Sequence, residues 1–273
     1  MARMIRGLLF DLDGTLVDHD TAAATAFTTA LETVPGASGV DHEAARRRWA
    51  ELERHAMDRY LAGELTFTGQ RRLRITTLVA ELGLGTWAEP EADAWFAGYL
   101  RHYEAAWRVF PDVPASLGAL AEEHPGLRLG VLTNGESGQQ RDKLRRVGLE
   151  TALPVLVVSG DIGVAKPEAG SFHAACEALR LPPSEVAYVG DRLDVDATAA
   201  SAAGLYGIWL NRAGRPVPGV PGRPSTGTAG GGTGRIGTGE PAPGPVHVPG
   251  HHAGEMPVIR TLRELTALLG GLT

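Results

Sequence analysis

Apolar and polar residues follow two different rhythms along the chain, and the two rhythms predict different folds. A short apolar run at 4–10, MIRGLLF, ends at an acidic turn and is typical of a buried strand. From about residue 21 to residue 103, apolar residues recur at helical spacing with charged residues between them. This pattern predicts a helical segment without strands, with helices around 23–31, 45–60, 73–82 and 94–107.

Beyond residue 126 short apolar runs alternate with amphipathic stretches, separated by short turns. Strand, helix, strand in this order implies parallel pairing with right-handed crossovers. We therefore predict an α/β fold, a doubly wound and mainly parallel Rossmann-like sheet with an inserted α-helical domain. The expected strands are 127–135, 154–161, 185–191 and 205–211, the expected helices are 139–147, 170–179 and 194–203, and the tail at 257–269 gives a short strand and a closing helix.

This pattern divides the chain into an α/β core, a helical domain and a low-complexity insert. Residues 1–18, 107–213 and 255–273 are expected to form the α/β core, and residues 19–106 the helical domain. Residues 214–254 hold 13 glycines and 8 prolines and cannot bury a core, so we predict that this insert is disordered. Its histidines could bind a metal, but an unconstrained loop is favoured because no cysteine or carboxylate cluster accompanies them. These histidines are His247, His251 and His252.

Composition narrows the function classes. The chain has 273 residues, a net charge of −6 and a mean hydropathy of −0.07, which disfavours a nucleic-acid scaffold. The single cysteine, Cys176, cannot form an internal disulfide, as is usual in a reducing compartment. We find no signal peptide and no run approaching the roughly 20 apolar residues of a membrane span. A cytoplasmic location without membrane or nucleic-acid partners is expected.

Polar residues gather where the predicted strands end. Residues 11–15 (DLDGT) follow the first strand, and 133–135 (TNG) end the second. The loop after the third carries 165–167 (AKP), and 190–196 (GDRLDVD) end the fourth. Each piece alone is typical of a turn or a helix cap. Together they bring carboxylates, a hydroxyl, an amide and a lysine to the sheet edge where ligands bind in α/β folds.

These residue types point to phosphoryl transfer. Converging carboxylates repel one another, and Mg²⁺ relieves that repulsion. A lysine and a threonine hydroxyl can hold phosphoryl oxygens. One carboxylate can attack phosphorus, and a second one two residues later can protonate the leaving oxygen and then activate water. The sequence therefore predicts two-step transfer of a phosphoryl group to water.

The motifs FDLDGT, LTNG, the AKP lysine and VGDRLDVD resemble the four motifs of the haloacid dehalogenase (HAD) superfamily, over about residues 4–20 and 107–212. The resemblance implies that Asp11 is the nucleophile and Asp13 the general acid and base. It implies that Thr133, Asn134 and Lys166 bind the phosphoryl group. Mg²⁺ would be held by the carboxylates of Asp11 and Asp191 and the backbone carbonyl of Asp13, while Asp196 lies near the metal or orients Lys166.

The helical insert looks like the family's cap of the first type, which closes over the site and reads the leaving group. The segment 132–144 (LTNGESGQQRDKL) is similar to the branch that contains N-acylneuraminate-9-phosphatases and pyrimidine 5′-nucleotidases. Candidate readers of the leaving group are His55 and Arg59 and the run 70–74, although such residues also commonly solvate a helix surface. That run comprises Gln70, Arg71, Arg72, Leu73 and Arg74.

A Mg²⁺-dependent phosphatase of a small phosphorylated metabolite is favoured over three alternatives. Phosphomutases of the superfamily usually carry a histidine where this chain has Ala22, Ala23 and Ala24. Its dehalogenases need no metal and lack the second aspartate that Asp13 supplies. A binding protein on this fold is favoured by loss of a catalytic aspartate, and none is lost. The substrate and the oligomeric state stay open.

Overall fold

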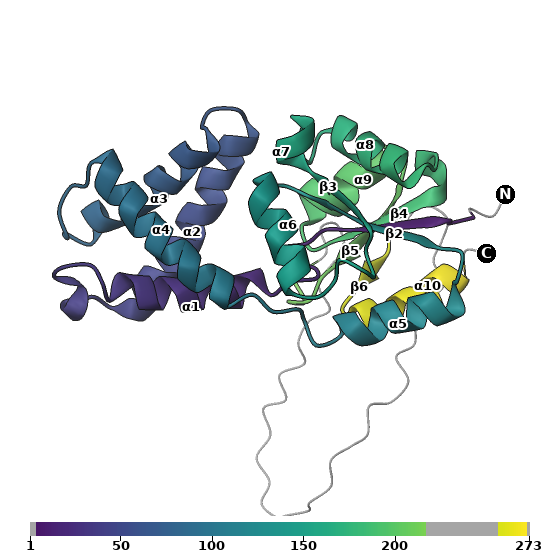
Figure 1. The fold of residues 1–273 in the computed structure, drawn as a ribbon, viewed down its shortest axis with the longest axis horizontal. Coiled ribbons are helices and arrows are strands. Elements are labelled where there is room, and N and C mark those ends of the chain that lie inside the picture. Colours follow the sequence, from purple (N-terminus) through teal and green to yellow (C-terminus); the bar gives the residue numbers. More distant parts are fainter. Residues whose placement is uncertain (1–3, 217–255, 272–273) are drawn as a thin grey trace, which may run out of the picture.

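A computed structural model describes residues 4–216 and 256–271 (Figure 1). Its described strands form one six-stranded sheet in the order β3-β2-β1-β4-β5-β6, in which every neighbouring pair is parallel. The predicted α/β fold with a parallel sheet is therefore confirmed. The strands are β1 (Gly7–Phe10), β2 (Arg128–Thr133), β3 (Val155–Val158), β4 (Val186–Gly190), β5 (Tyr206–Leu210) and β6 (Val258–Ile259).

Helices cover both faces of the sheet, so the central strands β1 and β4 are buried along their whole length. One face packs against α5 (Val113–Glu123), α6 (Ser137–Arg146) and α10 (Leu265–Gly270). The other packs against α8 (Ala169–Leu179) and α9 (Ala199–Ala202). Short helical turns complete the core: α7 (Ser159–Ile162), η2 (Pro183–Glu185), η3 (Leu193–Thr198) and η4 (Leu262–Glu264).

Three details differ from the sequence prediction. Helix α5 lies in a stretch for which no element was expected. The third strand was expected over 154–161, but it ends at Val158 and the chain turns into α7. The helix expected over 194–203 begins as a π-helical turn, η3, before α9. In η3 the Asp196 carboxylate accepts a hydrogen bond from the Arg192 backbone N–H at 3.0 Å, which fixes the side chain beneath the end of β4.

The four expected helices between β1 and α5 are present, with a hydrophobic cluster of their own beside the sheet (Figure 1). They are α1 (His19–Leu31), α2 (His42–Leu61), α3 (Phe67–Glu81) and α4 (Glu89–Ala105), with the short turn η1 (Ala37–Gly39). Asp18, Asp41 and Thr66 each accept a backbone N–H at a helix start. Trp49 occupies the centre, with Phe27 stacked 5.2 Å away. We call α1–α4 the helical bundle.

The helical bundle joins the sheet through two adjacent chain segments. Val17 bridges Val109 in antiparallel fashion, and the Asp18 N–H donates to the Arg108 carbonyl at 3.0 Å. The Phe110 N–H donates to the Leu16 carbonyl, also at 3.0 Å. The chain therefore enters and leaves the bundle at neighbouring points.

Strands β5 and β6 pair on either side of the residues that are not described. The Asn211 N–H donates to the Ile259 carbonyl at 2.8 Å, and the Asn211 side chain holds both backbone groups of Arg215 at 2.8 Å. The predicted disorder of 214–254 falls almost wholly outside the described residues, as do its three histidines. No helix in the described ranges is long and apolar enough to cross a bilayer.

Candidate active site

Asp11 and Asp191 meet because each directly follows one of two adjacent parallel strands, β1 and β4. The Asp11 N–H donates to the Val189 carbonyl at 2.8 Å, so strand pairing holds the start of the loop. Asp196 enters the same space from η3. One carboxylate oxygen from each of the three lies within 4.8 Å of the others.

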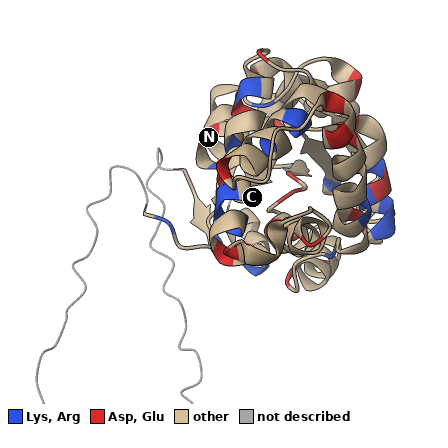
Figure 2. Cartoon of the chain, turned by 90° about the vertical axis from the view of Figure 1, so that its left-hand side faces the viewer, with Lys and Arg blue, Asp and Glu red and all other residues tan. Residues whose placement is uncertain are grey.

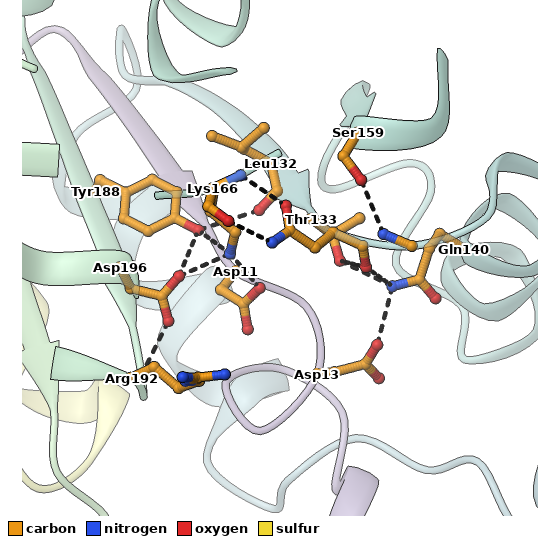
Figure 3. A network of polar contacts seen from close by, with 12 residues as sticks. Asp11, Asp13, Leu132, Thr133, Gln140, Ser159, Lys166, Tyr188, Arg192 and Asp196 are labelled. Atoms are coloured by element: carbon orange, nitrogen blue, oxygen red, sulfur yellow. Dashed lines mark hydrogen bonds and ion pairs between the residues drawn. The ribbon is translucent and has the colours of Figure 1, made fainter. Parts of the chain in front are cut away.

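Lys166 ties this cluster together (Figure 3). Its Nζ lies 2.7 Å from Asp11 Oδ1, 2.7 Å from Asp196 Oδ1 and 2.6 Å from the Tyr188 hydroxyl. Burial penalises the ammonium, but attraction to the two carboxylates outweighs it and raises the pKa of Lys166 above its ordinary value. The lysine therefore stays charged, and Asp196 both belongs to the acidic cluster and orients Lys166.

The acidic cluster has the electrostatics of a cation site. Burial raises the pKa of Asp11 to about 6 although Lys166 opposes it, and burial with the charges of Asp11 and Asp196 raises the pKa of Asp191 to about 8. An all-oxygen set of crowded carboxylates suits a hard divalent cation. Gly14 (φ +86°) permits the close approach, because a Cβ there would lie 2.8 Å from the Asp191 carboxyl carbon. These residues therefore fit Mg²⁺.

The carboxylate of Asp13 takes a different direction. It accepts hydrogen bonds from Lys143 Nζ at 2.6 and 2.7 Å and from Gln140 Nε2 at 2.9 Å (Figure 3 shows the Gln140 contact). Burial favours the neutral acid, but Lys143, followed by His19, lowers the pKa of Asp13 below its ordinary value. The structure thus separates two carboxylates two residues apart, one facing Lys166 and one facing Lys143.

The end of β2 supplies Thr133 and Asn134. The Thr133 hydroxyl accepts a hydrogen bond from Gln140 Nε2 at 2.8 Å. The Asn134 side chain pairs with the backbone of Lys166: its amide donates to the carbonyl and its oxygen accepts the N–H, both at 2.9 Å. Asn134 therefore fixes the loop that carries the lysine.

A cavity of about 590 Å³ lies between the sheet edge and the helical bundle. The candidate residues from the motifs all line it, so the structure brings them together: Asp11, Asp13, Thr133, Asn134, Lys166, Asp191 and Asp196. Gln70, Arg71 and Arg74 line it from α3. His55 and Arg59 are not among its described lining residues, because α2 turns a different face toward it, with Glu53, Met57 and Leu61.

A chain of charged contacts runs from Asp13 into the helical bundle. His19 Nδ1 lies 3.8 Å from Asp13 and 2.7 Å from the Tyr103 hydroxyl, and its Nε2 lies 3.4 Å from Glu53. Glu53 pairs with Arg74 at 2.9 Å. Burial favours the neutral imidazole, but Glu53 outweighs it and raises the pKa of His19 to about 9. His19 is therefore charged at neutral pH.

Sequence reasoning missed several of these residues. Gln140 and Lys143 could have been found from helical spacing, because they lie three residues apart on the helix that follows Thr133. Tyr188 sits inside β4, where it is indistinguishable from a core aromatic. His19 and Glu53 carry no local signal, because their partners lie on other elements.

Comparison with known proteins agrees with this fold. A family model, haloacid dehalogenase-like hydrolase, matches residues 5–204. The chain therefore belongs to the haloacid dehalogenase-like hydrolases, and the expected hydrolase class is confirmed.

Among curated relatives, the glyceraldehyde 3-phosphate phosphatase of Methanopyrus kandleri is 30% identical over 77% of this chain and 85% of its own length. The phosphoserine phosphatase of Thermus thermophilus is 30% identical over 67% of this chain and 70% of its own. The N-acylneuraminate-9-phosphatase of Mus musculus is 26% identical over 77% and 84%. The magnesium-bound HAD hydrolase YfnB of Bacillus subtilis shares the fold with a TM-score of 0.71 at 23% identity, over 97% of this chain and 99% of that one.

Proposed function

We propose that this protein is a Mg²⁺-dependent phosphatase that hydrolyses a small phosphate monoester through an aspartyl-phosphate intermediate on Asp11. The observation that carries the proposal is the pair of carboxylates in one cavity, Asp11 against Lys166 and Asp13 against Lys143. The names of the three curated relatives described above, each a phosphatase, support it.

In the first step an Asp11 carboxylate oxygen attacks phosphorus and the bond from phosphorus to the leaving oxygen breaks. Asp13 gives its proton to that oxygen, and the alcohol departs. In the second step Asp13 takes a proton from a water molecule that attacks the same phosphorus. The Asp11–phosphorus bond breaks, which returns the Asp11 carboxylate and releases inorganic phosphate.

The ion pair with Lys143 fits the second step directly. Because its pKa is held below the ordinary value, Asp13 is ionised in the free protein and ready to act as a base. To act first as an acid it must take up a proton when substrate binds. A phosphate dianion arriving beside Asp13 raises the carboxyl pKa and favours that uptake.

Asp11 and Asp191, with the backbone carbonyl of Asp13, would hold Mg²⁺, and Asp196 would keep Lys166 in place. The bound cation supplies charge neutralisation between the carboxylates and the phosphoryl oxygens. Lys166 and Thr133 would bind the phosphoryl group, and Asn134 would support Lys166 through its backbone. The helical bundle, residues 19–106, would act as the cap that excludes water and reads the leaving group.

The direct test is hydrolysis of p-nitrophenyl phosphate by the purified protein with Mg²⁺ and with EDTA. We expect turnover with Mg²⁺ only. Chloroacetate and 2-chloropropionate serve as dehalogenation controls, and chloride release without phosphate release would replace the proposal by the dehalogenase alternative. Absence of both activities would favour a binding protein.

A further inference from the structure

The bundle side of the cavity carries more positive than negative charge. Among the described lining residues from the helices, four are basic and two are acidic. The basic ones are His19, Arg54, Arg71 and Arg74, and the acidic ones are Asp20 and Glu53. Along the ribbon as a whole, in contrast, basic and acidic residues are interspersed (Figure 2). The excess is therefore a property of the cavity wall.

Glu53 does not neutralise this wall. Its carboxylate already pairs with Arg74 at 2.9 Å and lies 3.4 Å from His19. One anion therefore faces two cations. Asp20 is exposed at the start of α1.

Arg71 is the cation best placed to meet a ligand. It lies half-buried on α3 above the ring of Phe67, with its guanidinium carbon 4.5 Å from the ring centre, and it donates to Gln139 Oε1 at 3.2 Å. Among the described residues no carboxylate lies within ion-pair distance of Arg71. The next residue, Arg72, faces away and is paired with Asp93 and Glu89.

A second group on the same wall lacks a partner. Gln70 is 2% exposed, and its Oε1 has no hydrogen-bond partner in the part of the chain that the structure describes. An unsatisfied buried oxygen is unfavourable, and a donor supplied by a ligand satisfies it. Gln70 and Arg71 both line the cavity, beside Phe96 and Tyr99.

We infer that the leaving group of the natural substrate carries a carboxylate that pairs with Arg71 and a neighbouring hydroxyl or ammonium that donates to Gln70. The planar guanidinium matches the planar carboxylate, and a single negative charge matches the single charge of Arg71. Arg54, the other basic residue of this wall for which the described residues offer no ion pair, is exposed. The substrate class is thus the phosphate monoester of a small hydroxy or amino acid. This inference rests on the proposed function and specifies the leaving group of the same site.

The test compares substrates that differ in the carboxylate alone. 3-Phosphoglycerate is compared with glycerol 3-phosphate, and phosphoserine with phosphoethanolamine. A hydrogen-bonded charge pair in a partly buried site predicts that kcat/KM is about 10- to 100-fold higher for the carboxylate member of each pair. In Arg71→Gln that ratio is expected to fall to within about threefold of one.

Arg72→Gln is the matched control, because it removes the same charge from the same helix at a residue that faces away from the cavity. It should keep the wild-type ratio. A wild-type ratio near one, or an unchanged ratio in Arg71→Gln, overturns the inference. A preference for fructose 1,6-bisphosphate over fructose 6-phosphate without a preference in the carboxylate pairs assigns Arg71 to a second phosphate instead and also overturns it.

Failure of the inference is distinguishable from failure of the proposed function. If p-nitrophenyl phosphate is hydrolysed but none of the four compounds is, the inhibition constants of the same pairs against p-nitrophenyl phosphate give the ratio. If p-nitrophenyl phosphate is not hydrolysed, the proposed function fails. Calorimetric binding of the same four compounds then decides whether the carboxylate is recognised.

Discussion

Lys143 forms an ion pair with the carboxylate of Asp13. Its side chain is 2% exposed, and its ammonium contacts both oxygens of Asp13 and lies 5.2 and 5.3 Å from the ring centres of Tyr103 and Trp107. Few rotamers are open to a lysine enclosed in this way. It therefore fixes the direction of the Asp13 carboxylate, which is the group proposed to deliver the proton.

Lys143→Met should reduce turnover according to the leaving group. Without the ammonium, Asp13 keeps Gln140 but loses the contact that fixes its direction. We expect kcat to fall about 100-fold for an alkyl phosphate, whose leaving oxygen needs a proton, and less than tenfold for p-nitrophenyl phosphate. Arg146→Met, on the same helix and paired with Glu104, is the control. Equal losses on both substrates would mean that Lys143 only supports the fold.

Asp11→Asn should abolish catalysis while the fold persists. The amide cannot form the acyl phosphate, so kcat for p-nitrophenyl phosphate should fall by about 10⁴-fold or more. Circular dichroism and the melting temperature check the fold. Turnover close to wild type in this variant contradicts the assignment of the nucleophile.

Local signals account for which site residues were predictable. Asp11, Thr133 and Asp191 stand at the ends of apolar runs, and parallel strands deliver their ends to one edge. The Lys166 contacts required only that its loop return to this edge. His19 and Glu53 could not be predicted, because their pairing depends on how α1 packs against α2 and on how the bundle sits over the sheet.

At the scale of elements, α2 and α3 are joined by an ion pair between Glu53 and Arg74, and we expect substitutions in this pair to lower the stability of the helical bundle. Arg74 is 4% exposed and stacks over Trp49, with its guanidinium carbon 4.3 Å from the ring centre. Burial opposes ionisation of Glu53, but Arg74 and then His19 lower the pKa of Glu53 to about 2. The buried charges therefore depend on one another.

Glu53→Gln should destabilise the protein by about 3–5 kcal/mol at pH 7, because it leaves buried cations without a counter-charge. The folded pKa of Glu53 lies below its unfolded value of 4.5, so its stabilisation is present above pH 4.5 and is lost as pH falls toward 2. The difference in free energy of unfolding between wild type and variant, measured in urea at several pH values, should shrink accordingly.

Glu51→Gln is the matched control, since Glu51 lies on the same helix in an exposed pair with Arg48. It should leave the urea midpoint close to that of wild type. A gap between wild type and Glu53→Gln that stays constant down to pH 3 would show that packing, not charge, explains the loss.

The presence of a helix or strand could be predicted where apolar residues recurred regularly, as in the four bundle helices and in the strands. Helix α5 was missed because its sequence, VPASLGALAEE, contains a proline and a glycine that weaken a helical pattern. The π-helical start of η3 could not be predicted either. It depends on Asp196 reaching back to the Arg192 backbone and across to Lys166, which is a tertiary requirement.

For the whole molecule, Mg²⁺ should affect both activity and stability. EDTA should abolish turnover and Mg²⁺ should restore it, whereas Ca²⁺ should substitute poorly because its larger, looser shell disturbs the geometry of attack. If the cation binds the folded cluster of Asp11 and Asp191 as proposed, excess Mg²⁺ should also raise the melting temperature by a few degrees. Asp191→Asn should lose this shift. Full turnover in EDTA contradicts the metal requirement.

The bridge between Val17 and Val109 has a consequence for how such a protein can change over generations. Because the chain leaves the sheet and returns to it at adjoining points, any segment whose ends lie equally close can take the place of α1–α4 without altering strand order. The acidic cluster and Lys166 are built wholly outside that segment. Lineages can therefore exchange the part that we propose selects a leaving group while they keep the acidic cluster and Lys166, and grafting a relative's bundle between Asp18 and Arg108 repeats that exchange in the laboratory.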